Sequence, residues 1–169
     1  EKAFNLTIKK NTVAVVSDGS SVLGLGNNGP MAGLPVMEGK AVLYKKYANI
    51  DAVPIVLASQ NVDEIIEAVR MIAPTFGGIH LEDIAAPACF EIERRLIERL
   101  DIPVMHDDQH GTAIVALAGL INAATVVGKD LNTSKAVVNG VGAAGSAVMR
   151  LLKKYAPGLH IVAVDSEGI

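Results

Sequence analysis

Two pairs of adjacent acidic residues are the part of this sequence best suited to chemistry. Glu82-Asp83 ends the segment GGIHLED, and Asp107-Asp108 follows the segment IPVMH. Each pair closes a short apolar run that is typical of a β-strand. In a parallel α/β sheet, the carboxyl ends of the strands lie at one edge, where ligands bind. Two acidic pairs at that edge would repel each other, and a divalent metal ion between them is the simplest remedy.

A structural role is the alternative for these acids. A single pair would most simply cap the following helix or pair with a nearby Lys or Arg side chain. Adjacent strand residues point to opposite faces, but the chain turns after a strand's last residue, so both can then face one crevice. Because the two pairs follow neighbouring strands, we favour a metal site.

Lys40 is a second candidate for chemistry. In a helix over residues 40–48 it shares a face with Leu43, Tyr44 and Tyr47. Partial burial and a nearby cation would both lower the pKa of its amine, as a general base requires. Periodicity alone nevertheless favours an ordinary lysine, whose stem lies on apolar surface while its charge reaches water.

A glycine fingerprint, NGVGAAG, follows an apolar run and precedes a helical segment. Gly140 allows a tight turn, Gly142 lets the backbone approach a pyrophosphate, and Gly145 permits close helix packing. Asp165 ends the next apolar run, where an acid bonds a ribose hydroxyl, which favours NAD over NADP. The pattern predicts dinucleotide binding, and a plain β-α-β packing unit is the alternative.

The elements that must position these residues alternate between strand and helix. We expect strands over residues 12–17, 21–25, 52–58, 77–83, 102–106, 135–139 and 159–164, and helices over 40–48, 61–72, 87–100, 112–127 and 143–155. The first two strands are expected to form a hairpin around Asp18-Gly19. The repeated β-α-β order predicts an α/β fold with parallel sheets.

A polar stretch over residues 129–134 separates the fingerprint from the preceding segments. We therefore expect residues 1–108 to form one α/β domain and residues 109–169 to begin a Rossmann-type domain. A full domain of that kind needs about six strands, so we expect it to be truncated here.

Composition narrows the class of protein. The chain has 169 residues, half of them apolar, and a net charge of −3. No broad basic surface points to nucleic acid or anionic lipid. Cys89 is the only cysteine, so an intrachain disulfide is excluded and a reduced, cytoplasmic setting is expected. Its apolar surroundings favour a packing role over a nucleophilic one.

Residues 111–128 carry no charge and are long enough to suggest a membrane span. The segment also contains asparagine, threonines and glycines, and charged segments flank it. We therefore expect a buried core helix and no membrane partner.

Several sequence blocks resemble those of the bacterial malic enzymes. In order they read DGSSVLGLGNNGP, PVMEGKAVLYKK, APTFGGIHLEDIAAP, CFEIERRL and HDDQHGTAIVALAGL, and the fingerprint follows. The resemblance covers nearly the whole chain, and LED together with HDDQHGTA is its most specific part. It implies the oxidative decarboxylation of (S)-malate to pyruvate and CO₂, with NAD or NADP and with Mg²⁺ or Mn²⁺. It also implies a homo-oligomer, a dimer or larger.

The resemblance implies roles for individual residues. Glu82, Asp83 and Asp108 match the metal ligands of the family. Lys40 matches its general base, and Asp107 matches the acid beside the ligands, so we expect these two to be the catalytic residues. The nucleotide loop is expected at Gly140, Val141, Gly142, Ala143, Ala144 and Gly145, with Asp165 beyond it.

Other family residues have no counterpart here. The general-acid tyrosine lies upstream in the family, and nothing before Lys40 matches it. The asparagines that contact substrate and nicotinamide are expected beyond Ile169. Two other functions stay open: a malolactic conversion of malate to lactate, and a non-catalytic module that binds nucleotide or metal.

Overall fold

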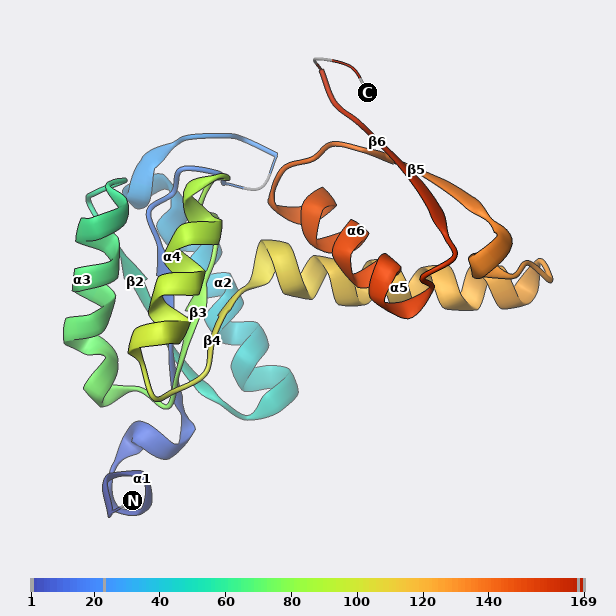
Figure 1. Cartoon of the computed structure of the whole chain (residues 1–169). Coiled ribbons are helices and arrows are strands. Elements are labelled where there is room, and N and C mark those ends of the chain that lie inside the picture. The colour runs from blue at the N-terminus through green and yellow to red at the C-terminus, as the bar shows by residue number, and fades with distance from the viewer. Residues whose placement is uncertain (1, 23, 167, 169) are drawn as a thin grey trace. The chain divides into compact units, whose positions relative to one another are not determined.

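The computed structural model describes residues 2–22, 24–166 and 168. The chain divides into two compact units, Glu1–His106 and Asp107–Ile169 (Figure 1). The first unit carries the first acidic pair, and the second begins with the other acidic pair and contains the glycine fingerprint.

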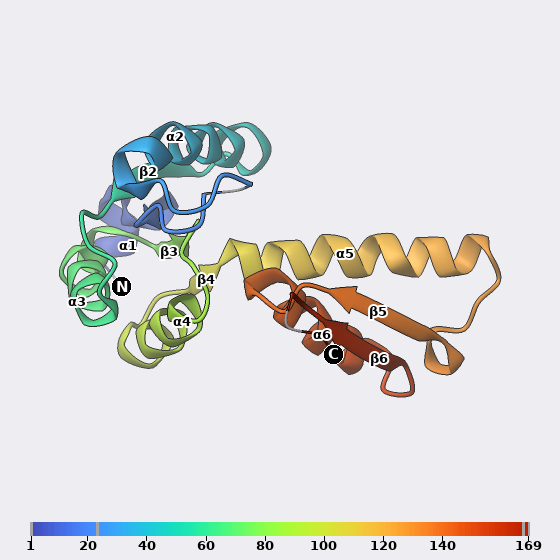
Figure 2. The same ribbon diagram turned by 90° about the horizontal axis from the view of Figure 1, so that it is seen from above.

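The first unit is built on a four-stranded parallel sheet with the order β2-β1-β3-β4. Its strands are β1 (Thr12–Ser17), β2 (Asp51–Val56), β3 (Gly78–Leu81) and β4 (Val104–His106). The crossovers are α2 (Gly29–Ala48), α3 (Val62–Ile72) and α4 (Ala88–Arg99). Helix α2 covers one face of the sheet, whereas α3 and α4 cover the other (Figure 2). The predicted α/β fold with parallel strands is confirmed.

Apolar residues from both helical layers and the strands form the core of this unit. Strand β1 is buried on both faces, which is why it reads as the continuous apolar run TVAVVS. The largest fully buried side chains in the unit are Met37, Ile65, Ile66, Ile79, Leu81, Ile84, Ile92 and Leu96. Cys89 is also fully buried, and this confirms its predicted packing position.

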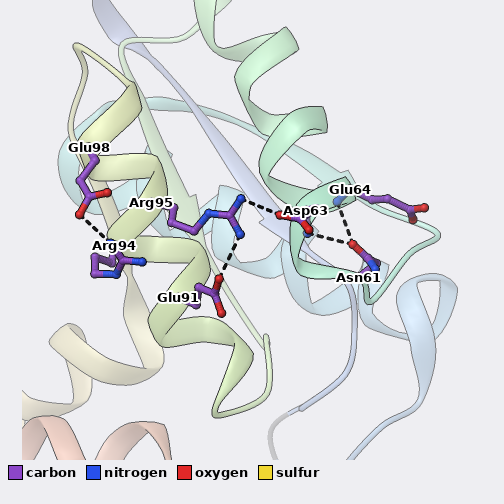
Figure 3. A network of polar contacts seen from close by, with 7 residues as sticks. All are labelled: Asn61, Asp63, Glu64, Glu91, Arg94, Arg95 and Glu98. Atoms are coloured by element: carbon purple, nitrogen blue, oxygen red, sulfur yellow. Dashed lines mark hydrogen bonds and ion pairs between the residues drawn. The ribbon is translucent and has the colours of Figure 1, made fainter.

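Helix α3 begins as its sequence predicts. The side chain of Asn61 accepts hydrogen bonds from the backbone N–H groups of Asp63 (2.9 Å) and Glu64 (3.1 Å). Arg95 of α4 reaches across to Asp63 at 2.6 Å and also bonds Glu91 of its own helix at 3.0 Å (Figure 3). A surface ion pair therefore ties two neighbouring helices together.

The segment between β1 and β2 differs from the prediction. No strand forms over the described part of residues 21–25, where Val22 makes a single bridge to Gly26, and residue 23 lies outside the described residues. Gly24, Gly26 and Gly29 have φ values of +72°, +80° and +77°, which is a loop conformation that a hairpin strand cannot adopt. The expected hairpin is therefore wrong.

Helix α2 also begins at Gly29 rather than at the expected residue 40. The part of α2 before residue 40 contains Gly33, Pro35 and Gly39, which are poor helix formers in isolation. Gly33 and Met37 are buried there, so packing against the rest of the unit overrides local propensity.

Smaller helical turns complete the two units. They are α1 (Lys2–Leu6), η1 (Ile8–Asn11) and η2 (Ala73–Thr75) in the first, and η3 (Leu131–Thr133) in the second.

In the second unit, α6 (Ala143–Tyr155) connects the parallel strands β5 (Lys135–Asn139) and β6 (His160–Val164). Leu152, Ala156 and Leu159 form its small core.

Helix α5 (Asp107–Val126) opens the second unit and is much more exposed than expected. Only Gln109, Ala113 and Ala124 are buried among its residues, and Ile114 and Val115 are 61% and 69% exposed. The helix is long and apolar enough to cross a membrane by length and composition, which is weak evidence on its own. The predicted buried helix is therefore wrong for the described residues.

Candidate metal and nucleotide sites

The two central strands of the first unit define a switch point in the sheet. The chain leaves β1 towards α2 on one face, and it leaves β3 towards α4 on the opposite face (Figure 2). Such a divergence opens a crevice beyond the strand ends, where α/β proteins bind ligands. Glu82 and Asp83 follow β3 directly at this point.

Both acids of this pair are buried. Glu82 is 6% exposed and Asp83 is 1% exposed. Asp83 has a φ of +54°, so the chain turns sharply just after the strand, at the place where both side chains can face one crevice. The backbone is held on both sides: Glu82 N–H donates to the Val16 carbonyl at 2.9 Å, and Ser21 N–H donates to the Asp83 carbonyl at 3.0 Å. Burying carboxylates without compensation is costly, so their partners matter.

Three side chains from α2 and β3 surround Glu82. Lys40 Nζ lies 3.1 Å from Glu82 Oε2 in a salt bridge, and the lysine side chain is 22% exposed. His80 Nε2 makes a hydrogen bond to the same oxygen. The hydroxyl of Tyr44 lies 2.7 Å from His80 Nδ1, and the two rings meet edge to face at 5.4 Å. Lys40 is therefore directed at the acidic pair rather than into solvent.

Asp107 and Asp108 are the first two residues of α5, directly after β4. His106 ends β4 and is the strand partner of Leu81, the last residue of β3. The backbone N–H of His106 donates to the buried carboxylate of Glu93 at 2.8 Å, which holds the end of β4 against α4. Both acidic pairs thus follow neighbouring strands, which is the arrangement expected from the sequence.

The turn from β5 into α6 has the features of a dinucleotide loop. Gly140 has a φ of +105°, which favours glycine. A Cβ on Gly145 would lie 1.8 Å from the carbonyl oxygen of Gly140, so the helix can pack on this loop only with glycine there. Nothing lies within 4 Å of where a Cβ would stand on Gly142, so the backbone there is open to a ligand.

Asp165 lies at the same end of the sheet. The backbone N–H of Gly140 donates to the Val164 carbonyl at 2.7 Å, so the start of the loop and the end of β6 are joined. Asp165 follows β6 directly and is exposed. Val141 lies in the loop, and Ala143 and Ala144 are the first residues of α6, where helical N–H groups without an intrahelical partner suit an anion.

Three further polar residues of this region were not predicted from the sequence as site residues: His80, Tyr44 and Glu93. A signal existed for the first two. His80 stands two residues before Glu82, on the same face of the strand, and Tyr44 stands one helical turn after Lys40. Glu93 gave no such signal, because its role depends on how α4 packs against β4.

The fold and these residues define a class of protein: an α/β chain with an acidic, oxygen-rich strand edge, followed by a dinucleotide-type β-α-β unit. Comparison with known proteins agrees with this class. The sequence profile described as malic enzyme, N-terminal domain, matches residues 1–97. The chain belongs to the malic enzyme family, which confirms the resemblance read from its sequence blocks.

Individual relatives show the same similarity. The chain is 60% identical over 168 residues to an NAD-dependent malic enzyme of Geobacillus stearothermophilus, covering 99% of this chain and 35% of that one. It is 58% identical to a bifunctional malic/malolactic enzyme of Bacillus subtilis, covering 99% of this chain and 40% of that one. A crystal structure of an NAD-dependent malic enzyme from Thermotoga maritima superposes with a TM-score of 0.96 at 52% identity, over 99% of this chain and 44% of that one. The chain therefore spans less than half the length of these relatives.

Proposed function

We propose that this protein is a malic enzyme that oxidises and decarboxylates (S)-malate to pyruvate and CO₂, with a divalent metal ion and NAD(P). Family membership supports the reaction class. The observation that carries the proposal is the contact of Lys40 Nζ with Glu82 in a buried acidic pair at the switch point of the sheet. A base candidate beside oxygen donors is what the oxidation of a chelating hydroxy acid requires.

The donor set fits a hard divalent cation. Glu82 and Asp83 supply buried carboxylate oxygens, and Asp108 follows the neighbouring strand within two residues. Mg²⁺ and Mn²⁺ prefer such ligands, and one or two carboxylates suffice when substrate and water complete the shell. We propose that these three residues hold the ion, with Asp107 beside them. When bound, the metal polarises the substrate oxygens as a Lewis acid.

Lys40 is the proposed general base. Once Nζ has released the proton that it carries in the salt bridge with Glu82, it would accept the hydroxyl proton of malate, and the bound nicotinamide would take the hydride from C2. The resulting β-keto acid loses its C4 carboxylate as CO₂, the C3–C4 electron pair forms an enolate, and protonation at C3 gives pyruvate. The loop over residues 140–145 binds the dinucleotide, and Asp165 at the end of β6 supports a preference for NAD. We also propose a homo-oligomer, a dimer or larger, from family resemblance, and a cytoplasmic setting from the single cysteine.

The test is turnover of the intact protein with malate and NAD, with and without Mn²⁺, followed by product analysis. We expect NADH and pyruvate only when the metal is present. Replacement of Asp108 by alanine should lower turnover by at least about a hundredfold, because loss of a mere hydrogen-bond partner of a metal ligand already costs about 10- to 100-fold. Asp101→Asn is the matched control, because Asp101 is an exposed acid just before β4 and should leave turnover unchanged.

Other outcomes identify the other functions. Lactate without net NADH would indicate a malolactic reaction. Turnover without metal, or normal turnover after the Asp108 substitution, would refute the proposed metal site. Nucleotide or metal binding without turnover would indicate a non-catalytic module.

A further inference from the structure

A buried histidine separates Glu82 from a tyrosine on α2. His80 is 2% exposed and lies in β3, two residues before Glu82. One ring nitrogen, Nε2, bonds Glu82 Oε2, and the other, Nδ1, lies 2.7 Å from the Tyr44 hydroxyl. Both polar atoms of the imidazole are therefore committed to named partners, which fixes the ring in one orientation.

The direction of these hydrogen bonds follows from the chemistry of the groups. An ionised carboxylate can only accept, so His80 Nε2 donates to Glu82. A neutral imidazole with its proton on Nε2 offers Nδ1 as an acceptor, and the Tyr44 hydroxyl then donates to it. The result is a one-way chain from Tyr44 through His80 to Glu82.

Helix α2 holds Glu82 by two routes. Lys40 reaches Oε2 directly at 3.1 Å, and Tyr44, one turn later on the same helix, reaches it through His80. Both routes end on the same carboxylate oxygen. The carboxyl group is thus oriented through Oε2.

We propose that His80 and Tyr44 are positioning residues that hold Glu82 in its metal-binding orientation. The proposal rests on the proposed function, because it takes Glu82 as a metal ligand. A carboxylate that must be ordered on binding loses side-chain entropy at that moment, and a carboxylate already held by a hydrogen bond does not. Partners of this kind typically change metal affinity by about 10- to 100-fold when they are removed.

Three substitutions separate the links of the chain. His80→Leu removes both hydrogen bonds. His80→Gln keeps an amide N–H donor near the position of Nε2, so it should rescue the contact with Glu82. Tyr44→Phe keeps the ring contact with His80 and removes only the hydroxyl. Tyr47→Phe is the matched control, because Tyr47 lies on the same helix and is 76% exposed.

The primary measurement is Mn²⁺ binding to the intact protein without substrate, from the electron paramagnetic resonance signal of free Mn²⁺. We expect His80→Leu to weaken binding by about 10- to 100-fold. Tyr44→Phe should weaken it by roughly three- to tenfold, the usual effect of one hydrogen bond. His80→Gln should stay within about threefold of wild type, and Tyr47→Phe should be unchanged.

The kinetics distinguish a positioning role from a merely structural one. If His80 and Tyr44 position Glu82, kcat at saturating Mn²⁺ stays near the wild-type value, while the Mn²⁺ concentration for half-maximal activity rises. Wild-type affinity in His80→Leu, or equal losses in His80→Leu and His80→Gln, would overturn the proposal. If His80→Leu does not fold, the affinity of Tyr44→Phe decides, and wild-type affinity there overturns it.

The two proposals fail in different ways. Normal malate turnover with wild-type Mn²⁺ affinity in every variant would overturn only the positioning role. Mn²⁺ binding that depends on His80, in a protein without malate turnover, would overturn only the proposed reaction.

Discussion

Glu82 shows how single residues make a buried acidic site tolerable. Removing a carboxylate from water costs several kcal/mol, and that cost is offset only by close partners. Here one oxygen, Oε2, accepts from both Lys40 and His80, and the backbone on either side is tied to β1 and to the loop after it. These contacts hold the two buried acids close together without a bound ion, so the proposed metal site is formed in advance.

Gly111 gives a residue-scale prediction about Asp107. A Cβ at position 111 would lie 2.1 Å from Asp107 Oδ1, so Gly111→Ala must displace that carboxylate. Asp107 is a proposed catalytic residue, and misplacing a catalytic group costs on the order of 10- to 100-fold in turnover. Alanine is also the better helix former by about 1 kcal/mol, so global stability should not fall with activity. Steady-state kinetics and thermal unfolding of the same variant test this.

Gly119 provides the control for that substitution. It lies in the same helix, is exposed, and has nothing within 4 Å of where a Cβ would stand. Gly119→Ala should raise stability by roughly 0.5–1 kcal/mol and leave turnover unchanged. If both variants lose activity equally, the loss is a general effect of substituting glycine in α5. The position of the Asp107 carboxylate would then not explain it.

Asp51 gives a prediction about pH. A hydrogen bond from Lys45, a second from Asn11, and the charge of Lys45 hold the pKa of the Asp51 carboxyl below its ordinary value of 3.8. Because the folded-state pKa is lowered, the pair stabilises the fold above the unfolded-state pKa, and this stabilisation is lost as pH falls through the folded-state pKa. Lys45→Met should return the Asp51 pKa towards 3.8 in an NMR titration.

Lys46→Met is the comparison for Lys45→Met, since Lys46 is an exposed neighbour whose nitrogen lies over the Tyr47 ring. It should leave the Asp51 titration in place. A low Asp51 pKa that persists in Lys45→Met would show that Asn11 alone is sufficient.

At the scale of elements, Arg95 makes a testable link between two helices. Its guanidinium joins Asp63 of α3 to Glu91 of α4, and the hydrogen bond to Asp63 is the main cause of its raised pKa (Figure 3). Arg94 pairs only within α4, with Glu98 at 2.7 Å. Arg95→Met should lower the melting temperature by roughly 1–3 °C more than Arg94→Met, because only Arg95 ties separate elements.

The difference between these two variants should shrink in about 1 M salt, where exposed charges are screened. Thermal unfolding at low and high ionic strength measures it. A difference that is independent of salt would mean that the arginine stem contributes by packing and the ion pair does not.

Elements were predictable where one local signal dominated. Strand β1 is a continuous apolar run, Asn61 is an N-cap residue that marks the start of α3, and the glycine fingerprint marks the turn into α6. The first half of α2 was not predictable, because burial of Gly33 and Met37 stabilises a helix that glycine and proline disfavour locally. The exposure of α5 was not predictable either, because an uncharged sequence gives no information on what packs around it.

The candidate site was also predictable only in part. The acidic pairs follow from the alternation of strands and helices, since parallel strands bring their carboxyl ends to one edge. The partners of Glu82 depend on which face of β3 meets α2, and that is a property of tertiary packing. The spacing of His80 and Tyr44 placed them near Glu82 and Lys40, but their hydrogen bonds were visible only in the structure.

At the scale of the whole molecule, metal binding and folding should be linked. A ligand that binds only the folded state stabilises it by about 2.7 kcal/mol at a concentration 100 times its Kd. Mn²⁺ at that excess should raise the melting temperature of the unit that contains Glu82 and Asp83 by roughly 10–15 °C. Excess EDTA should reverse the shift. Differential scanning calorimetry measures both, and the absence of any Mn²⁺-dependent shift would contradict the proposed site.

Asp83→Asn distinguishes a specific site from general ion binding. This substitution keeps the size of a side chain that is 1% exposed and removes one of two adjacent buried charges. Without metal, we expect the variant to be at least as stable as wild type, because Glu82 no longer faces a second negative group. With Mn²⁺, it should lose most of the shift, whereas Glu98→Gln, which removes an exposed acid of α4, should keep it. A site that holds two buried carboxylates at a cost in stability, and regains that stability only with a metal, is one maintained for function.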